Sequence, residues 1–119
     1  MRIIQLLTEN SLLKAHNTKL KKMLIRIVRM TFQEDKIEDF LLIFNRSKEK
    51  IRNFEGCQHL ELLRDKNAPN VMLTYSHWLS EAHLNAYRDS ELFKTTWAAT
   101  KVLFSDKPVA FSSERVEVV

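Results

Sequence analysis

The sequence has a single cysteine, Cys57, a single glycine, Gly56, and only two prolines among its 119 residues. One cysteine excludes a disulfide within the chain and a metal site built from several thiolates, and it is compatible with a reducing cytosol. So little glycine and proline is untypical of disordered or fibrous chains, and the apolar share of 45% is that of an ordinary folded protein. We therefore expect one domain with one hydrophobic core.

Long hydrophobic runs are also missing. The N-terminal segment 1–22 has an apolar run of only about five residues and no small-residue cleavage site, which excludes a signal peptide and a membrane-spanning helix. We expect a cytoplasmic protein without membrane insertion. The leucines of this segment allow a loose amphipathic helix whose basic end touches an anionic surface. We favour the alternative of a dispensable extension, with Met23 as the natural start.

An excess of one charge sign is absent from most of the chain. The net charge is +4, and residues 1–22 account for all of it with five basic side chains and one acidic one. Subtracted from the totals of 19 and 15, this leaves 14 basic and 14 acidic residues in 23–119. A neutral folded part lacks the basic surface that nucleic acid requires, so we expect no nucleic-acid partner. The break in charge predicts a basic extension over 1–22 and one domain over 23–119.

Hydrophobic periodicity divides the domain into strands and helices. Alternating or β-branched apolar runs predict strands over residues 23–32, 57–64, 71–78 and 109–119. Apolar residues three and four apart predict a helix over 37–54, and Gly56 follows as the residue that ends it in a left-handed conformation. A second helical region begins at a Ser80 cap, has a joint at Asp89-Ser90 and ends before Pro108.

The resulting order, β-α-β-β-α-β, predicts an α+β fold of the ferredoxin-like type, with a four-stranded antiparallel sheet and the helices on one face. Both faces of the first strand are apolar, with Leu24, Val28 and Met30 on one and Ile25 and Ile27 on the other. The helices cover only one face, and an exposed apolar face of that size marks an interface. We therefore predict a homodimer whose two sheets face each other.

Three segments carry a resemblance to a known family: NFEGC at residues 53–57, HWLSEAHLNAY at 77–87 and SELFK at 90–94. Through them, residues 23–111 resemble the antibiotic biosynthesis monooxygenase (ABM) family of dimeric α/β barrels. The resemblance implies a pocket between helices and sheet that holds a small apolar or aromatic ligand, often a quinol or polyketide-like ring. Dioxygen oxidises that ring without a metal or another cofactor. The protein excludes water, orients the ring and hydrogen-bonds a phenolate-like oxygen.

The resemblance also implies roles for individual residues. Trp78 matches the tryptophan that closes the third strand, and Thr74 stands where an asparagine can occur, so we expect these two to be catalytic by orienting the substrate. Leu84 stands where a tyrosine can occur, so the site lacks a polar partner for the substrate at this position. The residues expected to bind substrate by shaping the cavity are Val28, Met30, Leu84, Tyr87, Phe93 and Trp97. Periodicity alone leaves open that the aromatic members merely fill the core.

A second branch that the chain resembles binds and degrades haem through a histidine late in the second helical region. Trp97 matches that histidine, while Val28 and Tyr87 match an asparagine and a tryptophan. A tryptophan offers no axial ligand to iron, so haem degradation is disfavoured. We expect neither a cofactor nor a metal.

Strand register predicts a polar cluster away from the helices. If Leu60 and Leu62 face the helices beside Thr74 and Trp78, the four residues that share the opposite face are His59, Glu61, Tyr75 and His77. Such a set is able to bind a metal or relay protons. Strand alternation creates clusters of this kind without any function, so we favour polar members of the dimer interface.

Three further ionisable residues stand outside these patterns. Arg26 lies on the pocket side of the first strand, where it either meets a ligand carboxylate or reaches solvent at the sheet edge, and we favour solvent. His16 and His83 are expected to be exposed and without a role.

Two functions remain possible. The first is a cofactor-independent monooxygenase that oxidises a small electron-rich aromatic with dioxygen. The second is a non-catalytic ligand-binding or stress-response module on the same dimeric scaffold. The retained Trp78 and the aromatic wall favour the enzyme, whereas the changed polar set at Thr74 and Leu84 favours the module.

Overall fold

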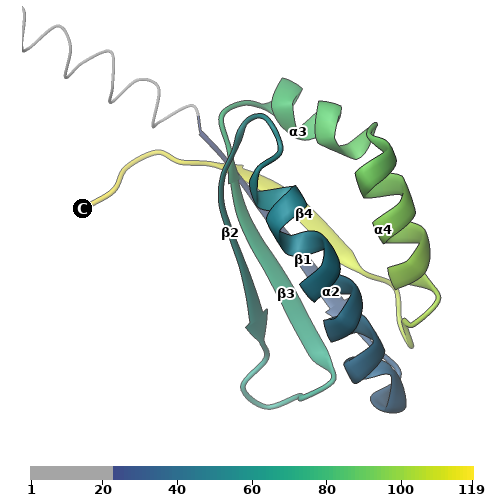
Figure 1. Cartoon of the computed structure of the whole chain (residues 1–119). Coiled ribbons are helices and arrows are strands. Elements are labelled where there is room, and N and C mark those ends of the chain that lie inside the picture. The colour runs from purple at the N-terminus through teal and green to yellow at the C-terminus, as the bar shows by residue number, and fades with distance from the viewer. Residues whose placement is uncertain (1–22) are drawn as a thin grey trace, which may run out of the picture.

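The computed structural model describes residues 23–119, and the predictions made for residues 1–22 and His16 lie outside this range. Its elements are, in chain order, β1 (Leu24–Thr31), the short 3-10 helix η1 (Glu34–Lys36), α2 (Ile37–Arg52), β2 (Cys57–Arg64), β3 (Val71–Trp78), α3 (Glu81–Arg88), α4 (Glu91–Lys101) and β4 (Val109–Glu114) (Figure 1). The second and third strands have the predicted bounds.

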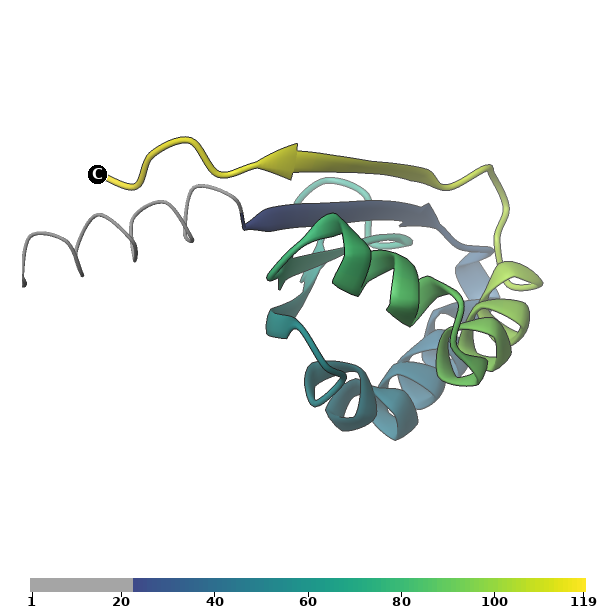
Figure 2. The same cartoon turned by 90° about the horizontal axis from the view of Figure 1, so that it is seen from above.

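One antiparallel sheet organises these elements, with its strands in the order β2-β3-β1-β4. All the α-helices lie on the same face of this sheet, and the view from above shows its opposite face uncovered by residues 23–119 (Figure 2). The predicted ferredoxin-like fold is therefore confirmed. Within the described residues, no helix is long and apolar enough to cross a membrane.

The helix ends follow the capping chemistry expected from the sequence. The side chains of Ser80 and Ser90 accept hydrogen bonds from the backbone N–H groups of His83 and Phe93, both at 3.2 Å, which begins α3 and α4 at the predicted joint. Helix α2 ends two residues earlier than predicted, because the N–H of Phe54 bonds the carbonyl of Ile51, three residues back, and not the one four residues back.

Strand β4 stops at Glu114, although a strand is predicted through residue 119. Glu114 pairs with Leu24, the first residue of β1, so the chain beyond it has run past the end of its neighbouring strand. Strand pairing needs a partner backbone, and the sequence pattern of the strand itself does not show where that partner begins.

Gly56 and His83 together turn the chain from α2 into β2. Gly56 has a φ of 90°, which side-chain-bearing residues rarely adopt, and a Cβ there would overlap the His83 ring. His83 is half-buried, and its Nδ1 lies 2.6 Å from the Ser80 hydroxyl oxygen. The expectation that His83 is exposed is therefore wrong, because the turn at Gly56 brings the backbone against its ring.

The hydrophobic core consists of two clusters under the helices. The first contains Leu24, Cys57, Trp78 and Leu84, with Phe54, Leu60 and Tyr87 packed against it. The second contains Met30, Phe32, Phe40 and Met72, with Phe44 and Phe104 among the side chains around it. Val28 lies between the two along β1 and packs on the second. The helix-facing side of the sheet is thus apolar at both ends.

The opposite face of the sheet is also partly apolar. The register places Ile27 of β1 beside Tyr75 of β3 and Phe111 of β4, with Ile25 and Val109 on the same side. Phe111 and Val109 are 48% and 53% exposed. This face, which we call the outer face, has the two-sided apolar pattern that the sequence predicts for β1.

Candidate functional site

A cavity of about 290 Å³ lies between the sheet and the helices. Strands β1 and β3 form its floor through side chains of alternate residues, and α2, α3 and α4 form its walls. Members of both core clusters line it. A hollow of this size and lining is typical of a site for a small apolar molecule.

Every residue that the sequence assigns to the site lines this cavity. The two residues predicted to be catalytic, Trp78 and Thr74, project from β3. The residues predicted to shape the pocket line it as well: Val28, Met30, Leu84, Tyr87, Phe93 and Trp97. Their position is thus observed, while their roles in binding and catalysis stay predictions.

The aromatic side chains form one continuous series of contacts around the cavity. Trp78 stacks on Tyr87 with ring centroids 4.9 Å apart, Tyr87 meets Phe93 edge-on at 5.3 Å, and Phe93 stacks on Trp97 at 5.9 Å. Phe104 continues the series from Trp97 at 5.6 Å. Rings held by neighbouring rings on both sides give the cavity a defined wall suited to a flat ligand.

Trp78 is fixed by a buried hydrogen bond. Its side chain is 1% exposed, and its Nε1–H donates to the Ser76 hydroxyl oxygen at 3.0 Å. The Ser76 hydroxyl in turn donates to the backbone carbonyl of Arg26 at 3.5 Å. Because the indole N–H is already used, Trp78 can offer a ligand its ring surface but no free donor.

Tyr87 is the ionisable phenol of the cavity. Burial raises the pKa of Tyr87 well above its ordinary value, and the neighbouring Cys57 adds to the increase. The phenol is therefore neutral at pH 7 and can donate a hydrogen bond. Within residues 23–119 its hydroxyl makes no hydrogen bond, so a ligand oxygen is a suitable partner.

The lining hydroxyl groups fall into two kinds. Ser47 and Thr100 donate to carbonyls one turn earlier in their own helices, those of Ile43 at 2.8 Å and Thr96 at 2.7 Å. These hydroxyls are satisfied internally. Thr74 makes no side-chain hydrogen bond to any described residue, which leaves its hydroxyl available to a ligand.

Two arginines line the cavity, Arg26, which the sequence placed on the pocket side of the first strand, and Arg88, which sequence reasoning missed. Arg26 does not simply reach solvent as expected, since it is half-buried, lines the cavity and donates to the Ser112 hydroxyl at 3.1 Å. Burial lowers the pKa of Arg26, and the positive charge of Arg88 lowers it further. The spacing of Arg88, four residues after Leu84, would have placed it on the cavity side of α3.

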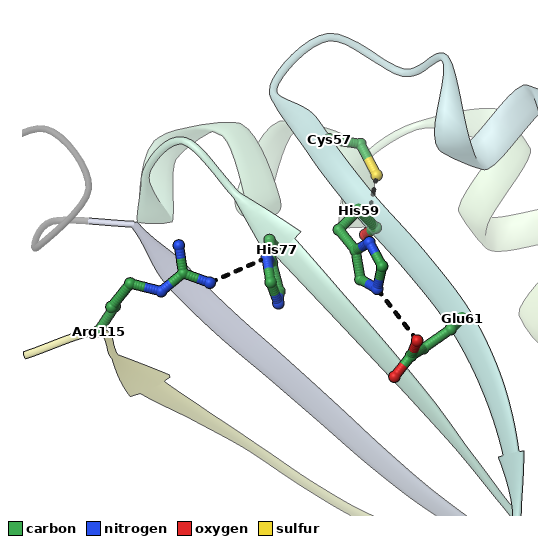
Figure 3. A network of polar contacts seen from close by, with 5 residues as sticks. All are labelled: Cys57, His59, Glu61, His77 and Arg115. Atoms are coloured by element: carbon green, nitrogen blue, oxygen red, sulfur yellow. Dashed lines mark hydrogen bonds and ion pairs between the residues drawn. The ribbon is translucent and has the colours of Figure 1, made fainter. Parts of the chain in front are cut away.

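The predicted polar cluster forms on the outer face, away from the cavity (Figure 3). The rings of His59 and His77 lie 4.7 Å apart, His59 Nε2 is 3.2 Å from the Glu61 carboxylate, and Arg115 donates to His77 Nδ1 at 3.2 Å. Burial, then the charges of Arg115 and His59, lower the pKa of His77, while Glu61 opposes them. The part of the chain that the structure describes holds no group of three or more metal-ligating side chains placed to bind a metal ion.

Solved structures share this architecture. The chain is similar to a conserved protein of Methanosarcina mazei Go1, with a TM-score of 0.79 and 13% identity over 82% of this chain and 97% of that one. A structure described as an antibiotic biosynthesis monooxygenase gives a TM-score of 0.74 and 18% identity over 79% of this chain and 99% of that one. A Mycobacterium tuberculosis protein gives a TM-score of 0.75 and 14% identity over 81% of this chain and 97% of that one. At these identities the likeness shows the fold alone.

The sequence itself was also compared with known proteins. No curated protein matches it. The model of the family described as antibiotic biosynthesis monooxygenase matches residues 23–99, which hold the cavity's floor and helical walls and begin where the charge of the chain changes. The chain therefore belongs to the antibiotic biosynthesis monooxygenase (ABM) family.

Proposed function

We propose that this protein is a monooxygenase that oxidises a small electron-rich aromatic molecule, such as a quinol or a polyketide-like phenol, with dioxygen. The observation that supports it best is the cavity of about 290 Å³ whose wall is a continuous series of aromatic rings. Family membership supports the general chemistry, and the cavity supplies a place for it.

In this proposal the ring itself supplies the electrons. A phenol with a free ring C–H para to its hydroxyl reacts with dioxygen to give a quinone and water. The ring C–H and the phenol O–H supply the two hydrogens of the water, so four electrons pass from the ring to oxygen and no further reductant is consumed. The protein contributes a dry, shaped site that orients the ring and stabilises its ionised oxygen. We assign the orienting surface to Trp78 and the hydrogen bonds to the hydroxyls of Thr74 and Tyr87.

We also propose that the protein works as a homodimer joined through the outer faces of its sheets. Ile27, Phe111 and Val109 leave apolar area on a face that the helices of residues 23–119 do not cover. Burying apolar area stabilises an interface by about 25 cal/mol per Å². The polar cluster of His59, Glu61 and His77 would then lie within that interface.

The alternative function is a non-catalytic module that binds a small aromatic ligand on the same scaffold. It is favoured by the internal hydrogen bonds of Ser47, Ser76 and Thr100, which leave few lining hydroxyls for chemistry. Leu84 is buried in the core cluster beside Trp78, so its side chain adds shape to the site but no polar group.

Oxygen uptake with a panel of hydroquinones and phenols separates the two functions. We expect one dioxygen consumed per molecule of substrate and a large loss of turnover in Trp78→Phe, which keeps an aromatic ring but changes the shape of the wall. Phe54→Leu is the matched control, because Phe54 packs against Trp78 without lining the cavity. Absence of uptake across the panel, combined with a ligand-induced rise in melting temperature, would favour the binding module.

A further inference from the structure

Two positive side chains line a cavity that is otherwise mostly apolar. Arg26 comes from the floor, on β1, and Arg88 from the wall, in the last turn of α3. They are the residues of fixed charge among the lining side chains of the described chain. A ligand that fills the cavity would remove part of the water around these two charges, which is costly unless the ligand brings a charge of opposite sign.

No carboxylate of the described residues provides such a charge. The ion pairs found within residues 23–119 join Lys36 to Asp39 and His59 to Glu61, so neither cavity arginine takes part in one. The side-chain partner of Arg26 is instead the neutral hydroxyl of Ser112 at 3.1 Å. The charge that acts on the pKa of Arg26 is a second cation, Arg88, which lowers it.

The charged residue of the cavity floor, Arg26, has apolar lining on both sides along the strands, since Trp78 pairs with Leu24, two residues before it. Along β1, Arg26 is followed on the same face by Val28 and Met30, and Met30 is 3% exposed within the second core cluster. Arg26 lies beside Ser76 and Ser112 of the neighbouring strands. The site therefore suits a ligand with an apolar body that carries a negative group beside Arg26.

We propose that Arg26 and Arg88 together bind the carboxylate of an aromatic acid, whose ring occupies the cavity against Trp78 and Tyr87. This inference rests on the proposed function for the aromatic nature of the ligand and adds the class of substrate, an acid rather than a neutral phenol. The planar guanidinium group of an arginine matches the two oxygens of a carboxylate. A carboxylate bound between two arginines also offsets the repulsion between their positive charges.

Isothermal titration of the full chain with 2-naphthoate and with 2-naphthamide tests the inference. The two probes have the same ring system and nearly the same size, but only naphthoate is negatively charged. We expect naphthoate to bind at least about tenfold more tightly than naphthamide at low salt, as charge-assisted hydrogen bonds allow. Raising the salt concentration should narrow the difference, since part of the attraction is screened.

Variants of the two arginines test whether the carboxylate of naphthoate binds to them. Arg26→Met and Arg88→Met should each lower naphthoate affinity about tenfold while changing naphthamide affinity less than about threefold. Arg88 is exposed, so its variant is expected to fold even if Arg26→Met loses stability. Arg64→Met, at the exposed end of β2 and outside the cavity, is the matched control and should leave both affinities unchanged.

This binding test does not depend on catalysis, because neither probe has to be oxidised. Equal affinity for the two probes, or an equal loss of both in the arginine variants, would overturn the arginine pair as a carboxylate site even if hydroquinones are turned over. A preference for naphthoate that both variants abolish would establish it even if no oxygen is consumed.

Discussion

Tyr87 of α3 lies flat against Trp78 of β3, with ring centroids 4.9 Å apart and ring planes inclined by 23°. Both residues line the cavity, Trp78 belongs to the core cluster around Cys57 and Leu84, and Tyr87 packs against that cluster. The wall of the site and the core of the protein are therefore one packing unit. Substitutions in the wall will change stability as well as ligand binding, and each experiment has to measure both.

Ser76→Ala should destabilise the protein by about 1–3 kcal/mol, because it leaves the buried Nε1–H of Trp78 without an acceptor. Urea denaturation measures the change. In a Trp78→Phe background the same substitution should cost much less, since the donor is gone. Thr95→Ala, at an exposed position on α4 away from the outer face, is the control and should stay within about 0.5 kcal/mol of wild type. Equal effects of the two alanine variants would contradict the role of Ser76.

Gly56→Ala should lower the unfolding free energy by about 1–3 kcal/mol, because a φ of 90° strains a residue with a Cβ. The new methyl group also overlaps the His83 ring. Thermal or urea unfolding checks the prediction. His83→Ala removes the ring but keeps the Cβ, which lies as close to the new methyl group as the ring atoms do, so the double variant is expected to recover little of the loss. Unchanged stability of Gly56→Ala would show that the turn tolerates a side chain.

Stability should fall as the pH drops below about 6.5 because of His77. Its pKa is lowered in the folded protein, chiefly by burial and by Arg115, with His59 adding to the effect and Glu61 opposing it. Below the ordinary value of 6.5, the unfolded chain therefore binds more protons than the folded one, and protonation favours unfolding. Urea denaturation at pH 7.5 and 5.5 should show a smaller decline for His77→Gln than for wild type. Equal declines would rule out His77 as the source.

Phe111→Glu should convert the proposed homodimer into a monomer. Phe111 is 48% exposed on the outer face, and a carboxylate there would be buried without a partner if two sheets pack together. Leu42→Glu is the matched control, since Leu42 is 53% exposed on α2, away from that face. Sedimentation velocity at micromolar concentration distinguishes the two species. A wild-type protein that sediments as a monomer would overturn the interface.

Much of the candidate site was predictable because strand and helix periods fix which residues share a face. Thr74 and Trp78 are four residues apart on a strand, so both project to the same side as the helices. The alternation of strand residues placed Arg26 correctly on the cavity side, but its side chain was predicted to reach solvent. The sequence does not show that β4 runs beside β1 and places Ser112 next to Arg26. Arg88 was missed since its charge is typical of an exposed helix end.

The sequence by itself determined the element order, the caps at Ser80 and Ser90, the turn at Gly56 and the faces of each strand. These depend on local rules, which act between residues close together in the chain. Only the tertiary structure decided that a cavity remains between the helices and the sheet and that Arg26 and Arg88 both line it. Those features depend on the distance between packed elements, and a single side chain's volume can open or fill such a space.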